Sequence, residues 1–138
     1  MKNELILVVD FGGQYNQLIA RRVRDLNVYC EVIPYNRALI EVKIKKPIGI
    51  IFTGGPNSVY DENAPKIEKE IFELDIPILG LCYGMQLISK TFGGVVEKAE
   101  KKEFGKTICI KDKNSKLVAN MKSETTVWMS HQDQVVKL

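Results

Sequence analysis

The chain has 138 residues, 45% of them hydrophobic, which suffices for one globular domain with a buried core and leaves no room for a second. Its 20 basic and 17 acidic residues give a net charge of +3, and the lysines are interleaved with acidic or apolar residues, which argues against nucleic acid binding. No apolar run is long enough to cross a membrane and the N-terminus is unlike a signal peptide, so we expect a cytoplasmic protein without a membrane partner.

Short apolar runs alternate with helical patterns in the first two thirds of the chain. We expect strands at residues 5–9, 28–33, 48–52 and 76–79, and helices at residues 17–26, 39–44, 65–74 and 85–92. This alternation predicts a parallel sheet. After Gly93 and Gly94 the apolar stretches become shorter, and residues 107–110 and 125–129 are more typical of edge strands or a hairpin.

Three glycine-rich loops follow predicted strands, at residues 10–14, 53–58 and 80–84. Ligands of open parallel sheets bind beyond the carboxyl ends of the strands, where the strand order reverses. The first loop does not fit the dinucleotide fingerprint, so we do not expect NAD binding. Each loop taken alone is also consistent with an ordinary turn.

The third loop, Gly80-Leu81-Cys82-Tyr83-Gly84, places a cysteine on the turn between a strand and a helix. This is the pattern of a nucleophile elbow. The helix N-terminus would stabilise the Cys82 thiolate, and the backbone N–H of Tyr83 could stabilise an oxyanion. The alternative is that Cys82 is an inert thiol in the core. The spacing of the three cysteines predicts neither a metal site nor a disulfide.

Four segments together carry a resemblance that spans nearly the whole chain: residues 10–24, 52–60, 80–86 and 127–131. The sequence resembles the class I glutamine amidotransferases, and among them the amidotransferase domains of the GMP synthase family. The resemblance implies an α/β fold, a flavodoxin-like open and mostly parallel sheet with helices on both faces, and a single amidotransferase domain over residues 1–138.

The resemblance also implies the site. Cys82 would attack the side-chain amide of glutamine, release ammonia and leave a glutamyl thioester for water to hydrolyse. The N–H groups of Gly55 and Tyr83 would form the oxyanion hole, and the glutamine-binding residues would be Gly54, Gln86, Ser130 and His131. From the residues alone, Gln86 could equally lie on an exposed helix face and Ser130 could face solvent.

His131 is the only histidine of the chain, but it does not match the catalytic base. In the family the base belongs to a His-x-Glu segment further on, and the sequence ends at Leu138, so we expect little release of ammonia by these 138 residues alone. Gln132 also stands where the family usually has glycine, which leaves the backbone path after His131 open.

The partners implied are glutamine and a synthetase domain or subunit. No cofactor or metal is expected in this chain, whereas ATP and Mg²⁺ would belong to the synthetase region, through which a homodimer could also form. Two alternatives stay open: another cysteine hydrolase of the same fold, γ-glutamyl hydrolase-like or DJ-1-like, and a flavodoxin-like binding module without catalysis.

Overall fold

The computed structural model describes residues 4–111 and 115–138, apart from the side chains of residues 100–103 and 130–132. The chain forms two compact units. The first runs up to Val96 and includes Val135–Leu138, and the second comprises Glu97–Gln134.

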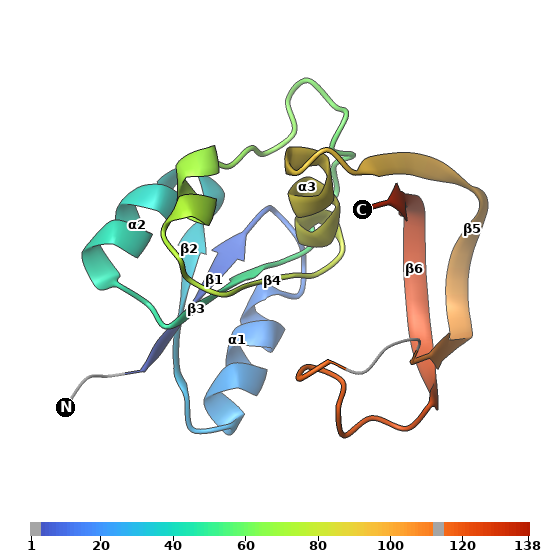
Figure 1. The fold of residues 1–138 in the computed structure, drawn as a ribbon, viewed down its shortest axis with the longest axis horizontal. Helices are drawn as coiled ribbons and strands as arrows, with labels where there is room; N and C mark the ends of the chain where they lie inside the picture. The colour runs from blue at the N-terminus through green and yellow to red at the C-terminus, as the bar shows by residue number, and fades with distance from the viewer. Residues whose placement is uncertain (1–3, 112–114) are drawn as a thin grey trace. The chain divides into compact units, whose positions relative to one another are not determined.

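The first unit is built on a four-stranded parallel sheet (Figure 1), which confirms the predicted sheet type. Its strands are β1 (Leu5–Asp10), β2 (Tyr29–Pro34), β3 (Gly49–Phe52) and β4 (Ile78–Gly80). The order across the sheet is β2-β1-β3-β4, and Val8 of β1 is aligned with Val32 on one side and Ile51 on the other. The strand order therefore reverses between β1 and β3: β2 is added on one side of β1, and β3 and β4 are added on the other.

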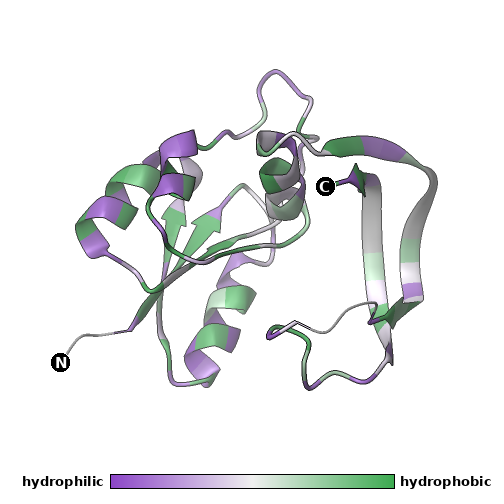
Figure 2. Ribbon diagram, in the orientation of Figure 1, coloured by the Kyte–Doolittle hydropathy of each residue, from purple (hydrophilic) through white to green (hydrophobic). Residues whose placement is uncertain are grey.

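Helices cover both faces of this sheet, as predicted. Because side chains alternate along a strand, β1 sends Leu7 and Val9 to one face and Val8 to the other, all three fully buried. The first face packs against α2 (Ala38–Lys45) and α3 (Tyr83–Thr91), and the second against α1 (Asn16–Asp25). In Figure 2 the arrows of β1 and β2 are largely hydrophobic, whereas α1 and α2 mix both colours, as surface helices do.

The predicted helix at residues 65–74 is wrong in extent. Only a 3-10 helix, η2 (Lys69–Glu73), forms there, and Glu68 before it is extended, with φ −65° and ψ 131°. The carbonyl of Pro65 accepts a hydrogen bond of 2.6 Å from the Tyr83 hydroxyl, so a tertiary contact occupies an acceptor that a helix would use. A second short 3-10 helix, η1 (Tyr35–Arg37), leads into α2.

Two long strands, β5 (Val95–Ile110) and β6 (Glu124–Lys137), pair as a two-stranded sheet. The expected edge strands or hairpin are confirmed, but the strands have 16 and 14 residues where the apolar pattern predicted short stretches. The reason is that both faces carry exposed positions, as the neighbouring residues Ile108 and Cys109 show, so the sequence has no continuous alternation of apolar and polar residues.

Candidate active site at the carboxyl ends of the strands

Cys82 lies at the turn between β4 and α3, and its side chain is exposed. Its backbone has φ 52° and ψ −116°, a region that non-glycine residues rarely occupy and that costs about 1–3 kcal/mol. The predicted strand–turn–helix is therefore present, and the thiol is not an inert core residue. Strain of this kind persists only where the surrounding structure enforces it.

The glycines beside Cys82 allow main chain to approach main chain. A Cβ on Gly84 would lie 2.5 Å from the carbonyl oxygen of Phe52, at the end of β3. A Cβ on Gly80 would lie 2.8 Å from the backbone of Met85. Because real Cβ atoms do not come this close, both positions require glycine for the strand to turn directly into the helix.

The other two glycine-rich loops meet at the same edge of the sheet. A Cβ on Gly13, after β1, would lie 2.5 Å from the carbonyl oxygen of Gly54, after β3. One on Gly55 would lie 2.6 Å from the carbonyl oxygen of Phe11, and one on Gly54 would contact the Cys82 Cβ at 3.4 Å. The three loops are thus stacked against each other where the strand order reverses, with Gly54 next to the thiol-bearing residue.

Two backbone donors belong to this stack, the N–H groups of Tyr83 and Gly55. Tyr83 is the first residue of α3, so its N–H has no acceptor within the helix. Among the described residues, no hydrogen bond uses the N–H of Tyr83 or of Gly55. Together with the positive end of the helix dipole, the N–H of Tyr83 favours negative charge beside Cys82.

The Tyr83 side chain points away from solvent and is only 2% exposed. Its ring packs against Phe11, with centroids 5.4 Å apart, and its hydroxyl donates to the Pro65 carbonyl oxygen. Burial, with the nearby Asp61 and Tyr35, raises the pKa of this hydroxyl to about 12, so it remains a neutral donor. Tyr83 therefore connects the elbow to the end of the loop that carries Gly54 and Gly55.

Of the glutamine-binding residues predicted from the sequence, the structure describes the side chain of Gln86 but not those of Ser130 and His131. Gln86 lies in the first half of α3 and is buried, 8% exposed, so the alternative of an exposed helix position is wrong. Ser130 and His131 belong to β6 in the second unit, and their side chains, like that of Gln132, lie outside the described residues. Their role stays a prediction.

Three residues that sequence reasoning missed hold the stacked loops. Thr53 is fully buried, and its hydroxyl donates to the Val9 carbonyl oxygen at 2.7 Å. The Asp10 carboxylate accepts from the N–H of Gly12 at 2.7 Å and from the side-chain amide of Asn16. An aspartate at the end of a strand and two residues before a glycine is a known turn signature that could have identified this contact.

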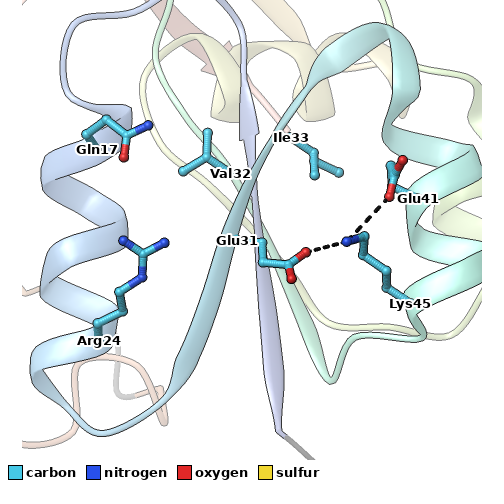
Figure 3. A pocket seen from close by; sticks show the side chains of 7 residues that line it. All are labelled: Gln17, Arg24, Glu31, Val32, Ile33, Glu41 and Lys45. Carbon is cyan, nitrogen blue, oxygen red and sulfur yellow. Dashed lines mark hydrogen bonds and ion pairs between the residues drawn. The ribbon is translucent and has the colours of Figure 1, made fainter.

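A separate groove lies at the lateral edge of the sheet formed by β2, between α1 and α2 (Figure 3). Its volume is about 510 Å³ and its charged lining consists of Arg24, Glu31, Glu41 and Lys45. The Lys45 ammonium lies 2.5 Å from Glu31 and 3.7 Å from Glu41, an arrangement that lowers the pKa of the Glu31 carboxyl and raises that of Lys45. The two cations and two carboxylates balance, and none of the lining residues is a cysteine, serine or histidine.

Two further features concern the described ranges, clusters of metal ligands and membrane-spanning helices. No group of three or more His, Cys, Asp or Glu residues there could hold a metal ion. No helix in that part of the chain is both long and apolar enough to span a bilayer.

Comparison with known proteins identifies the family. The model of the class I glutamine amidotransferases matches residues 7–138. The chain therefore belongs to this family, and the resemblance seen in its sequence is confirmed. It is 71% identical over 98% of its length to the glutamine-hydrolysing GMP synthase of Finegoldia magna, and 63% identical over 95% to that of Acetivibrio thermocellus. It spans 26% of the length of each.

Solved structures support the fold. A Thermoplasma acidophilum protein described as part of a GMP synthase superimposes with a TM-score of 0.79 at 32% identity, over 96% of this chain and 66% of that one. A glutamine amidotransferase of Thermotoga maritima gives a TM-score of 0.75 at 20% identity, over 96% and 62% of the two chains. The α/β fold predicted from the sequence is thus the fold of this family.

Proposed function

We propose that the chain provides the glutamine-hydrolysing site of a GMP synthase, with Cys82 as the nucleophile. The observation that carries this proposal is an exposed cysteine in a strained turn at the N-terminus of α3, in contact with the glycine loop after β3. The thiol is accessible, and the donors beside it are main-chain N–H groups without an acceptor among the described residues.

The chemistry follows from these positions. The thiolate attacks the side-chain amide carbon of glutamine, an S–C bond forms, and the carbonyl electron pair moves onto oxygen, where the N–H groups of Gly55 and Tyr83 stabilise it. Collapse breaks the C–N bond, and the nitrogen leaves as ammonia after gaining the proton that the thiol lost, carried by the base that the family resemblance implies. Water then cleaves the thioester to glutamate and regenerates the thiol.

The ammonia would be consumed by a synthetase domain or subunit that converts XMP to GMP with ATP and Mg²⁺. The names of the curated relatives and the 26% share of their length support this assignment. ATP and Mg²⁺ would bind in that synthetase region, and Gly54, Gln86, Ser130 and His131 would hold the glutamine. The reaction would take place in the cytoplasm, where Cys82 stays reduced.

Thiol labelling tests the proposal, because the chain carries its own control. Cys82 and Cys109 are both exposed, whereas Cys30 is buried. We expect iodoacetamide to label Cys82 and Cys109 in the native protein, and glutamine to slow labelling at Cys82 alone, by about tenfold at saturation. Peptide mass mapping reads both sites in one sample.

A chloromethyl ketone analogue of glutamine sharpens the test. It should label Cys82 with saturable kinetics and leave Cys109 almost unmodified, and Cys82→Ser should abolish the reaction. Equal labelling of Cys82 and Cys109 by the analogue, or a lack of protection by glutamine, would rule out a glutamine pocket at the elbow.

A further inference from the structure

The loop between β3 and η2 carries one of the two proposed oxyanion donors but has no helix or strand of its own. We call residues 53–65 the oxyanion loop. Its first residues are fixed, because Thr53 bonds to Val9 and the Thr53 carbonyl accepts from the Gly84 N–H at 3.0 Å. Its last residue, Pro65, is held by the Tyr83 hydroxyl. The segment in between needs a separate anchor.

Lys90, in the last turn of α3, supplies that anchor. Its ammonium donates to the Val59 carbonyl oxygen at 2.7 Å, a contact 31 residues apart in sequence, and lies 4.7 Å from the centre of the Tyr60 ring. Val59 is buried, 4% exposed. A charged hydrogen bond and a cation–π contact therefore act on two successive loop residues.

Tyr60 is bound at its other end as well. Its hydroxyl accepts from the Val96 N–H at 3.3 Å, at the start of β5. The ring is thus held between this backbone contact and Lys90, although the residue is 56% exposed. Such a fixed geometry at the surface indicates a specific contact rather than a free side chain.

A simpler role for Lys90 would be to neutralise the C-terminal carbonyls of its own helix. Those carbonyls already have partners: Ile88 accepts from the Phe92 N–H, Ser89 from the Gly94 N–H and Lys90 from the Gly93 N–H. The ammonium instead reaches the oxyanion loop. Lys90 therefore connects α3 to the oxyanion loop and does not cap its own helix.

We propose that Lys90, with Tyr60, is a positioning residue that locks the oxyanion loop to α3. This inference rests on the proposed function. Helix α3, which begins directly after Cys82, then holds the loop at Pro65 through Tyr83 and at Val59 through Lys90. Both proposed oxyanion donors are thereby positioned by one helix, α3. Small shifts in such geometry lower the reaction rate strongly.

The test compares the glutamine chloromethyl ketone with iodoacetamide at Cys82 in the same chain. For Lys90→Met we expect the maximal rate of inactivation by the analogue to fall by about tenfold, at an unchanged half-saturating concentration. Iodoacetamide labelling of Cys82 and Cys109 should not change, because it needs no oxyanion hole. Lys90→Arg should restore the rate to within about twofold, since a guanidinium can make both contacts. Lys69→Met, at an exposed lysine of η2, is the matched control and should behave as wild type.

Other results overturn the inference. If Lys90→Met reacts with the analogue at the wild-type rate, or if both reagents slow in parallel with a loss of thermal stability, Lys90 has only a structural role or none. Should Lys90→Met not fold, Tyr60→Leu must show a fall of about threefold for the analogue alone. If the wild-type protein shows no saturable labelling, the proposed function fails and takes this inference with it.

Discussion

The carboxyl ends of the strands and the lateral edge formed by β2 differ in the groups that they present. Main-chain N–H groups and a thiol lie at the first, and charged side chains line the second. At the carboxyl ends of β1, β3 and β4, glycines bring main chain against main chain next to an exposed thiol, and the N–H groups of Gly55 and Tyr83 have no acceptor among the described residues. Along β2, Arg24, Lys45, Glu31 and Glu41 line a groove in which the charges balance. We therefore base the proposed reactive site on N–H groups without an acceptor and not on the volume of a groove.

The largest loss of stability is expected from a substitution that breaks the main-chain contact between Gly84 and Phe52 at the elbow. Gly84→Ala would place a Cβ 2.5 Å from the Phe52 backbone, so we expect a loss of at least about 3 kcal/mol of stability and no labelling by the glutamine analogue. Urea unfolding measures the loss. Gly93→Ala is the control, because nothing lies within 4 Å of its added Cβ and only its φ of 86° penalises alanine, by about 1 kcal/mol.

The next effect concerns the buried hydroxyl of Tyr83. Tyr83→Phe leaves the Pro65 carbonyl without its donor and should cost about 1–2 kcal/mol at neutral pH. The folded-state pKa of about 12 lies above the unfolded value of 10.0, so this stability is present below pH 10 and is lost as the pH rises toward 12.

The pH dependence gives a separate readout for the same variant. Between pH 10 and 12 the wild-type protein should lose about 2–3 kcal/mol more than Tyr83→Phe. Parallel stability curves for the two proteins over this range would show that the hydroxyl is not protected from ionisation.

A smaller effect, on the free energy of unfolding, is a gain of stability and not a loss. Cys82 has a positive φ that glycine adopts without strain, so Cys82→Gly should stabilise the fold by about 1 kcal/mol while removing all labelling at that site. Thermal unfolding measures the gain. A variant that is less stable than the wild type would mean that contacts of the cysteine side chain outweigh its backbone strain.

The smallest effect is expected at the β2 edge. Glu31→Gln removes the charge partner of Lys45, yet exposed ion pairs contribute little, so the melting temperature should fall by less than about 3 °C. Analogue labelling of Cys82 should be unchanged. A loss of Cys82 labelling in Glu31→Gln would show that the groove along β2 contributes to the site at the elbow, against our expectation.

Much of this architecture was predictable because its elements carry strong local signals. The strand–glycine–helix pattern around Cys82 and the apolar run of β1 predicted both the sheet and the meeting of three loops at one edge. The contacts of Lys90 and Tyr83 could not be predicted, because each side chain binds a backbone carbonyl, which every residue type offers. The length of β5 was missed for a related reason, since its pairing uses main-chain atoms while several of its described side chains, among them Ile108 and Cys109, are exposed.

The donors proposed to face the substrate are peptide N–H groups from Gly55 and Tyr83, and a peptide group does not ionise over the range in which proteins stay folded. The contribution of these two donors is therefore constant from mildly acidic to mildly alkaline buffer. Any change of the labelling rate with acidity must then originate in groups other than these two peptide N–H groups.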